Sequence, residues 1–290
     1  MPLRPFTLPS GAKPTVPGFG TGTKWYKPGN PAIDRNVVDA VASAIKLGYR
    51  HVDGAEIYGT DPEIGLAIKE AGVPRSELFV TNKIIANIAD PRKALLDILS
   101  RMQLDYLDLC LIHTPFFSKE KSGISIAEAW KVLETLKAEG LAKNIGVSNF
   151  AKKDIDAVLA VATEPIAVNQ IEFSPYLQNQ TEGIVEYCQS KGIRVAAYTP
   201  LTPITTGKGG PLDPVLAKLA AKYGKTESQI VLKWVVARGV IPITTSAKPT
   251  RQAESLDLDG FELDPADVDE ISTVGAQKHV RCYFTAEYNP

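Results

Sequence analysis

The sequence has few of the features that mark secreted, membrane and metal-binding proteins. Its three cysteines, Cys110, Cys188 and Cys282, lie far apart and match neither a CxxC motif nor zinc-finger spacing. A disulfide framework or a metal site is therefore not expected, and the cysteines suit a reducing compartment. The N-terminal stretch lacks the apolar centre of a secretion signal, and nowhere do about 18 apolar residues follow one another. We expect a cytoplasmic protein that does not enter a membrane.

An excess of charge of one sign is also lacking. The formal net charge is −1, which provides no basic face for nucleic acid and no polybasic anchor for a membrane surface. No composition break marks a linker, and a hydrophobic fraction of 44% suffices for a large core. We expect one domain spanning residues 1–290 and a small-molecule partner. Because no exposed apolar stripe stands out, we also expect a monomer.

Short runs rich in β-branched residues alternate along the chain with longer segments of helical period. This pattern is typical of βα units and a parallel sheet. Two extended pieces joined by a turn at PSG predict a short N-terminal β-hairpin before the first unit. Eight strands are expected after it, near residues 18–21, 50–54, 78–84, 106–113, 143–148, 167–173, 194–199 and 240–244.

The helical segments between these strands carry start and stop signals. Residues 61–72 open with Asp-Pro and end in glycine, and residues 125–140 begin with Ser125 followed three residues later by Glu128. Residues 213–224 and 226–239 predict two consecutive helices before the last strand. One of them is surplus to a simple repeat, and extra helices are expected at the C-terminus.

Eight strands each followed by a helix close most economically as a (β/α)8 TIM barrel, although an open doubly wound sheet uses the same alternation. The barrel is favoured because no GxGxxG motif follows the first strand. In such barrels the active site forms at the C-terminal ends of the strands. The polar residues predicted there are Asp53, Lys83, His113, Ser148, Asn149, Gln170, Glu172 and Tyr198.

Four residues of this region form a candidate catalytic group. Lys83 ends an apolar strand, where an isolated ammonium needs a partner, and Asp53 is available to provide one. His113 ends the next strand, and Tyr58 follows Asp53 closely enough to fold back over the barrel mouth. Each residue alone has a structural explanation, such as a buried ion pair or a packed ring. Their joint placement favours catalysis.

Six ordered segments resemble the signature segments of the aldo-keto reductases, and the resemblance spans nearly the whole chain. They read GYRHVDGAEIYGTDPEIG, FVTNKI, DLCLIHTP, IGVSNF, AVNQIEFSPY and AAYTPL. The overall pattern is most similar to fungal reductases of conjugated polyketones, ketopantoyl lactone and α-keto amides. The resemblance implies NADPH-dependent reduction of a carbonyl compound to the alcohol.

The resemblance also implies roles for individual residues. The catalytic tetrad falls on Asp53, Tyr58, Lys83 and His113, and Trp25, Tyr58 and His113 are expected to contact the substrate. The residues implied for NADPH are Thr21, Gly22, Thr23, Asp53, Ser148, Asn149, Gln170, Tyr198, Thr199, Leu201, Thr244, Thr245, Ser246, Lys248 and Arg251. The short C-terminal tail predicts a compact aldehyde or activated ketone as substrate.

The chemistry explains why the tetrad needs these residue types. A free tyrosine titrates near pH 10, and an adjacent ammonium is expected to lower that pKa. Lys83 supplies the charge for Tyr58, Asp53 keeps Lys83 protonated, and His113 can donate to the substrate carbonyl.

The cofactor phosphate site departs from the family pattern. Most relatives have a lysine after the last strand and an arginine shortly beyond it, and both hold the 2′-phosphate. Here Ile243 occupies the lysine position, and Lys248 returns the cation three residues before Arg251. A nearby helix N-terminus also favours an anion. We therefore expect a preference for NADPH over NADH.

Two other functions stay open at this point. Lys83 can be the Schiff-base nucleophile of an aldolase, although that needs a neutral amine, which Asp53 opposes. The chain can also be a non-catalytic cofactor-binding subunit or sensor. In addition, the glycine-rich segment 205–210 is either a lid over the cofactor or a plain linker.

Overall fold

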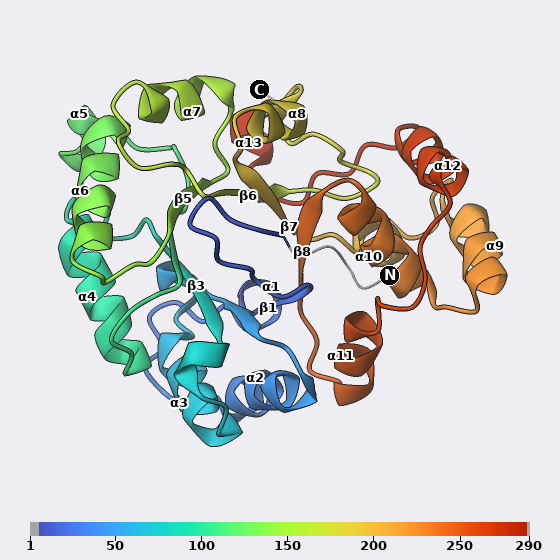
Figure 1. Cartoon of the computed structure of the whole chain (residues 1–290), viewed down its shortest axis with the longest axis horizontal. Coiled ribbons are helices and arrows are strands. Elements are labelled where there is room, and N and C mark those ends of the chain that lie inside the picture. The colour runs from blue at the N-terminus through green and yellow to red at the C-terminus, as the bar shows by residue number, and fades with distance from the viewer. Residues whose placement is uncertain (1–5, 289–290) are drawn as a thin grey trace.

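The eight β-branched runs form eight parallel strands that close into a barrel, with helices around it (Figure 1). The computed structural model describes residues 6–288. Each strand pairs with the next in the chain, and β1 also pairs with β8. The predicted TIM barrel is confirmed. Its strands are β1 (Gly18–Gly20), β2 (His51–Asp53), β3 (Phe79–Ile84), β4 (Leu109–Ile112), β5 (Ile145–Ser148), β6 (Val168–Glu172), β7 (Arg194–Tyr198) and β8 (Val240–Thr244).

Helices and short helical turns connect the strands. Up to β6 they are α1 (Gly22–Trp25), α2 (Arg35–Leu47), η1 (Glu56–Tyr58), α3 (Asp61–Ala71), η2 (Arg75–Glu77), α4 (Pro91–Met102), α5 (Lys119–Ser122), α6 (Ile126–Ala138) and α7 (Lys152–Leu159). After β6 they are α8 (Ile184–Ser190), η3 (Thr202–Ile204), α9 (Asp213–Tyr223), α10 (Glu227–Ala237), α11 (Pro249–Leu256), α12 (Pro265–Gly275) and α13 (Thr285–Tyr288).

The predicted helix ends agree with the local chemistry. Ser125 and Glu128 form a reciprocal capping box at the start of α6, which satisfies two backbone N–H groups that have no partner inside the helix. After α6, Gly140 has a φ of +81°, a left-handed conformation that suits glycine. Sequence-level capping signals therefore place both ends of this helix.

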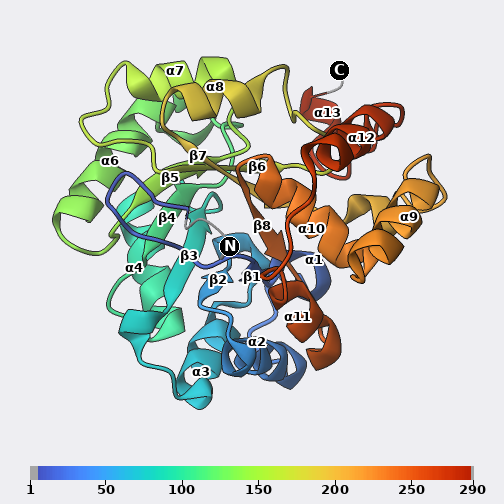
Figure 2. The ribbon, with the colours of Figure 1, turned by 45° about the vertical axis from the view of Figure 1, so that its right-hand side comes forward.

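The surplus helix is also present. Both α9 and α10 lie between β7 and β8, and α12 packs beside them at one side of the barrel (Figures 1 and 2). The Trp234 indole of α10 donates to the Val268 carbonyl and to the Ser272 hydroxyl of α12. Lys222 of α9 reaches Asp264 and Asp267 at 2.6 and 2.7 Å. The extra C-terminal helices thus pair with the surplus helix outside the repeat.

Part of the predicted N-terminal hairpin, residues 1–5, lies outside the described residues, and residues 6–17 form only its turn. Gly11 donates to the Leu8 carbonyl and Leu8 to the Ala12 carbonyl, but no strand forms between residues 6 and 17. Three prolines in this stretch lack the N–H group that a strand ladder needs. The segment instead crosses one end of the barrel (Figures 1 and 2), where Phe6 and Leu8 join the apolar side chains inside it.

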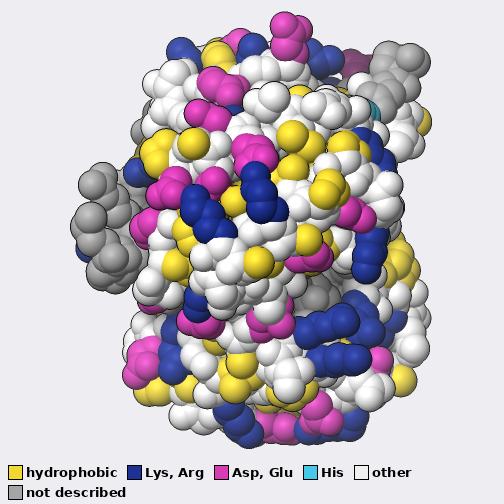
Figure 3. All heavy atoms as spheres, turned by 90° about the vertical axis from the view of Figure 1, so that its right-hand side faces the viewer, with side chains coloured by type: hydrophobic (Ala, Val, Ile, Leu, Met, Phe, Trp, Pro, Cys, Tyr) yellow, Lys and Arg dark blue, Asp and Glu magenta, His cyan; other side chains and the backbone are white. Residues whose placement is uncertain are grey.

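A second and larger core fills the space between the strands and the surrounding helices. It includes Trp130 of α6 and Trp234 of α10, both fully buried. On the face drawn in Figure 3, side chains of both charges lie among hydrophobic ones, with Lys and Arg gathered toward the lower right. Among residues 6–288, no helix is long and apolar enough to cross a bilayer.

Candidate active site

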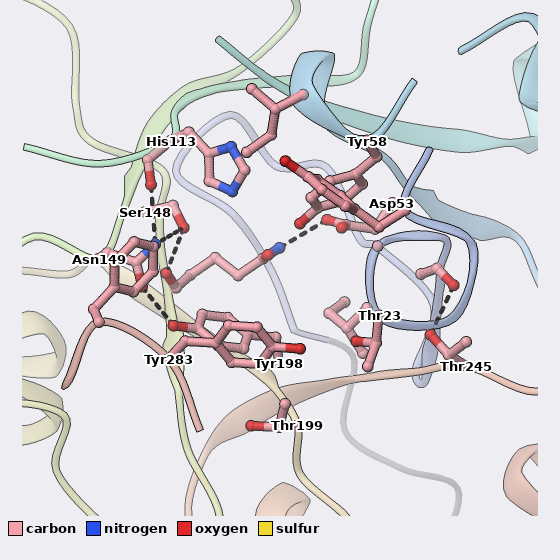
Figure 4. Close-up of a pocket in the computed structure, with 17 residues that line it drawn as sticks. Thr23, Asp53, Tyr58, His113, Ser148, Asn149, Tyr198, Thr199, Thr245 and Tyr283 are labelled. Carbon is pink, nitrogen blue, oxygen red and sulfur yellow. Dashed lines mark hydrogen bonds between the residues drawn. The ribbon is translucent and has the colours of Figure 1, made fainter. Parts of the chain in front are cut away.

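A cavity of about 480 Å³ opens at the C-terminal ends of the strands (Figure 4). Because parallel strands in register end on the same rim, side chains far apart in sequence meet there. The lining residues are Gly20, Gly22, Thr23, Tyr26, Asp53, Ile57, Tyr58, His113, Ser148, Asn149, Gln170, Tyr198, Thr199, Ile243, Thr245, Tyr283 and Phe284.

Asp53 and Lys83 form a buried ion pair below this cavity. The Lys83 ammonium lies 2.6 Å from Asp53 Oδ1 and also donates to the Gly54 carbonyl at 2.8 Å. Asp53 Oδ2 accepts from the Gln170 amide at 2.7 Å. Burial alone would lower the pKa of Lys83, but Asp53 and Tyr58 together more than offset this and raise the pKa above its ordinary value. Lys83 is therefore held as a cation with no exposed surface.

Tyr58 ends the helical turn η1, which is fastened to the loop after β3. The Glu56 carboxylate accepts from the backbone N–H groups of Ile85 and Asn87 at 3.0 and 3.3 Å. Gly22 lies against the phenol ring, and a Cβ atom there would come within 2.6 Å of it. The loop after β1 therefore needs glycine where it passes Tyr58.

Burial and the Lys83 charge act on Tyr58 in opposite directions. Its ring centroid lies 5.2 Å from the Lys83 ammonium and 5.7 Å from the His113 ring centroid. Burial raises the pKa of Tyr58, and Lys83 offsets only part of that increase. Lys83 lowers the pKa of Tyr58 as expected, but the larger effect of burial leaves that pKa above its ordinary value. Desolvation of the phenolate outweighs the nearby cation, so the phenol holds its proton at neutral pH.

His113 follows the last residue of β4 and borders the cavity. Burial and the Lys83 charge together hold the pKa of His113 well below its usual range, so the imidazole is neutral. Its Nδ1 atom is buried and has no hydrogen-bond partner among the described residues. A neutral imidazole can donate one hydrogen bond from a ring nitrogen without carrying charge.

Polar side chains after β5 and β6 form a connected group on one side of the cavity. Ser148 donates to the Gln170 carbonyl at 2.8 Å, and Asn149 donates to the His113 carbonyl at 2.9 Å. The Tyr198 hydroxyl donates to the Asn149 side chain at 2.7 Å. Asn149 has a φ of +62°, a left-handed conformation that asparagine tolerates better than most residues. These bonds fix the orientation of the Tyr198 ring at the cavity wall.

Other predicted cofactor residues are divided between the cavity and its surroundings. Gly22, Thr23, Thr199 and Thr245 line it. Six predicted cofactor residues do not line the cavity. The side chains of Thr21 and Thr244 hydrogen-bond those of Thr60 and Tyr49, and Leu201 packs on the core. The other three, Ser246, Lys248 and Arg251, come after β8. Lys248 and Arg251 are exposed around the start of α11.

Trp25 does not line the cavity. Its side chain is 7% exposed and packs in the core, with its ring centroid 6.1 Å from that of Phe19. The short helix α1 turns the chain so that Tyr26, which is 56% exposed, faces the cavity instead. Tyr26 therefore borders the cavity where Trp25 was expected, and the contact of Trp25 with substrate stays a prediction.

Sequence reasoning missed the contribution of the C-terminal tail. Tyr283 and Phe284 line the cavity, although the sequence places them more than a hundred residues after the ends of β5 and β6. The cluster of aromatic residues in the last ten positions was the available signal. The glycine-rich segment 205–210 lines no part of the cavity. It packs on Tyr176, and its Gly207 carbonyl accepts from Lys278 at 2.9 Å.

Comparisons with known proteins agree with this arrangement. The model of the aldo/keto reductase family matches residues 18–276. The chain belongs to the aldo/keto reductase family. It is 44% identical to the NAD/NADP-dependent indole-3-acetaldehyde reductase of Schizosaccharomyces pombe, over 94% of this chain and 96% of that protein. It is 43% identical to the NADPH-dependent alpha-keto amide reductase of Saccharomyces cerevisiae, over 98% of this chain and 95% of that protein.

Solved structures of the family have the same fold. An aldo-keto reductase of Bombyx mori in complex with NADP superposes with a TM-score of 0.85 at 33% identity, over 99% of this chain and 98% of that one. The likeness to fungal reductases expected from the sequence motifs is confirmed by the two yeast relatives.

Proposed function

We propose that the protein reduces compact aldehydes and activated ketones to alcohols with NADPH. The observation that carries the proposal is the joint placement of Tyr58, His113 and the Asp53–Lys83 ion pair around one cavity. Family membership and two yeast relatives that are reductases by name support it. The activated ketones that we favour are α-dicarbonyls, α-keto lactones and α-keto amides.

The residues of the cavity suit a nicotinamide. Ser148, Asn149 and Gln170 bring hydroxyl and amide groups together at one wall, a donor and acceptor set that matches a carboxamide. The partly exposed ring of Tyr198 provides an aromatic surface beside them. A nicotinamide bound there supplies the hydride.

The protein residues supply the proton and the orientation. The His113 imidazole donates a hydrogen bond to the carbonyl oxygen of the substrate and so directs it toward Tyr58. Tyr58 gives its proton to that oxygen as negative charge develops on it. The Lys83 cation stabilises the phenolate that remains, and Asp53 keeps Lys83 protonated throughout. Proton and hydride reach opposite ends of one C=O bond.

The roles of Lys248 and Arg251 belong to the same proposal. Both side chains are exposed, with Lys248 at the N-cap of α11 and Arg251 in its first helical turn. That turn contains no acidic residue to repel a phosphate. Lys248 and Arg251, together with the hydroxyl groups of Thr245 and Ser246, then recognise the 2′-phosphate that distinguishes NADPH from NADH.

The aldolase alternative is opposed by the state of Lys83. A Schiff-base nucleophile must be neutral and must reach its substrate, whereas Lys83 is a cation without exposed surface. We further propose a cytoplasmic location and a monomeric state. The three unpaired cysteines support a reducing compartment.

The test is the loss of NADPH absorbance on addition of a panel of carbonyl compounds. We expect one NADPH to be oxidised per alcohol formed with α-diketones, α-keto amides and isatins. A protein that binds NADPH but consumes none with any carbonyl would be a cofactor-binding subunit or sensor. That result would overturn the proposed function.

A further inference from the structure

The C-terminal tail, residues 281–288, lies over the mouth of the barrel and supplies part of the cavity wall. Tyr283 and Phe284 line the cavity, and the Tyr283 ring stands edge-on to the Tyr198 ring at 5.8 Å (Figure 4). Phe284 and Tyr288 also contact Phe116, from the loop after β4, with ring centroids 5.3 and 5.5 Å away. The position of this tail therefore sets the shape of the cavity.

Glu172, the last residue of β6, is directly bonded to the tail. Its Oε1 atom accepts from the backbone N–H of Cys282 at 2.6 Å, and its Oε2 atom accepts from that of Tyr283 at 3.0 Å. The residue is 1% exposed and does not line the cavity. A buried carboxylate needs such donors, and the two consecutive amides satisfy one oxygen each.

Glu172 is itself held firmly in place. Its backbone N–H donates to the side chain of Gln180 at 2.6 Å, and the Gln180 carbonyl accepts from Arg281 at 2.7 Å. The strand, the loop after it and the tail thus form one bonded unit. Farther along the tail, the Tyr288 hydroxyl donates to the Asn149 carbonyl. Loss of Glu172 would therefore free residues 282–284 while the end of the tail stays attached.

The tail backbone needs such support. Phe284 has a φ of +54°, a left-handed conformation that is unfavourable for an aromatic residue. A non-glycine residue keeps this conformation only where its surroundings determine it. The bonds from Glu172 to the two preceding residues, together with the contacts of Phe284 to Phe116, supply that constraint.

We propose that Glu172 is a positioning residue that anchors Cys282 and Tyr283, so that Tyr283 and Phe284 limit the size of the carbonyl compounds accepted. The statement about substrate size rests on the proposed function, whereas the anchoring does not. Glu172 lines no part of the cavity and acts only through the tail.

The anchoring can be measured through a thiol that the chain already carries. Cys110 and Cys188 are fully buried, and Cys282 is the partly exposed cysteine of the three. Its rate of reaction with a thiol reagent therefore reports the freedom of the tail. Glu172→Gln also removes a negative charge beside Cys282 and so changes the pKa of the thiol. Rates are therefore compared as limiting values at high pH, where the thiol is ionised in every variant.

We expect Glu172→Gln to raise the limiting rate at Cys282 about tenfold, equivalent to about 1.4 kcal/mol of lost anchoring. Glu172→Asp keeps the charge, but its side chain is too short to reach both amides. Its limiting rate at Cys282 should therefore lie between those of the wild type and Glu172→Gln. Glu172→Asp serves as the test if Glu172→Gln fails to fold. Glu134→Gln is the matched control, because Glu134 accepts from the consecutive N–H groups of Thr163 and Glu164 at 2.6 and 2.9 Å. The Glu134→Gln variant should leave the limiting rate of reaction at Cys282 unchanged.

The consequence for substrates is measured with one compact and one bulky aromatic ketone. In Glu172→Gln we expect the KM of the compact ketone to rise several-fold with little change in kcat, and the relative kcat/KM of the bulky ketone to increase. Equal labelling in Glu172→Gln, Glu172→Asp and wild type would overturn the anchoring. Faster labelling with unchanged selectivity would overturn the limit on substrate size. If the wild type reduces no carbonyl compound, the proposed function fails while labelling still decides the anchoring.

Discussion

Replacement of Lys83 by methionine separates the catalytic role of the buried ion pair from its structural cost. Lys83 has no exposed surface, and its ammonium bonds Asp53 Oδ1 and the Gly54 carbonyl. Methionine has a similar length and fills the space without a charge. The change leaves the Asp53 carboxylate buried, with the Gln170 amide as its remaining hydrogen-bond partner among the described residues. An uncompensated charge in this position is unfavourable.

The expected magnitude follows from that unpaired carboxylate. Breaking a buried ion pair by removal of one partner costs about 3–5 kcal/mol. For a chain of 290 residues, with an unfolding entropy of roughly 2.1 cal/mol/K per residue, this lowers Tm by about 5–8 °C. Carbonyl reduction should fall by several orders of magnitude as well, because the phenolate of Tyr58 loses its stabilising cation.

Thermal unfolding and single-turnover NADPH oxidation are measured on the same preparations. The double variant Lys83→Met/Asp53→Asn is the control, since it leaves no unpaired charge. It should regain most of the lost Tm yet remain inactive. A Lys83→Met protein as stable as the wild type, or a double variant no more stable than the single one, would refute the reasoning about the ion pair. Recovery of activity in the double variant would refute the role of the cation.

Three other predictions concern pH, the cofactor and the substrate. Burial lowers the pKa of His51 to about 4 and that of His113 well below its ordinary value. Both stay neutral in the folded protein below pH 6.5, His51 down to about pH 4, but protonate in the unfolded chain below about pH 6.5. The free energy of unfolding should therefore fall as the pH drops from about 6.5 toward 4, by up to about 1.4 kcal/mol per pH unit for each histidine. Urea unfolding checks this, and a slope unchanged in His51→Gln would contradict it. Lys248→Ala and Arg251→Ala should each weaken NADPH binding about ten- to a hundredfold in fluorescence titration and leave NADH binding nearly unchanged; if both bind NADPH as the wild type does, the phosphate is held elsewhere. Compact activated ketones should exceed steroid ketones in kcat/KM, and an equal value for a steroid would show that the cavity is larger than the tail implies.

Local patterns in the sequence predicted the barrel well. Alternating strand and helix signals placed all eight strands, and the capping box at Ser125 and the glycine after it placed both ends of α6. These signals act within a few residues, so the sequence displays them directly. The described part of the predicted N-terminal hairpin, residues 6–17, shows the limit of the same reasoning, because three prolines there lack the N–H group that a strand ladder needs.

The site was predictable where it depends on strand ends and unpredictable where it depends on loops. Lys83 and Asp53 follow from the register of β2 and β3, and they lie in contact. By contrast, one turn of helix α1 decides that Tyr26 and not Trp25 borders the cavity. Tyr283 lines the cavity because the C-terminal tail folds back across the barrel. The lowering effect of Lys83 on the Tyr58 pKa was predictable, but the net increase in that pKa was not. It is set by the balance between burial and one nearby charge, and burial is a property of the folded chain.

The most direct test of the account is single-turnover carbonyl reduction by Tyr58→Phe with NADPH already bound. The substitution removes one hydroxyl and keeps the ring that packs against Gly22 and His113. We predict that hydride transfer slows by about 10²–10⁴-fold, the usual contribution of a general acid, while the affinity for NADPH measured by fluorescence stays near that of the wild type. Transfer at the wild-type rate would show that the proton comes from another group and would contradict the assignment of Tyr58.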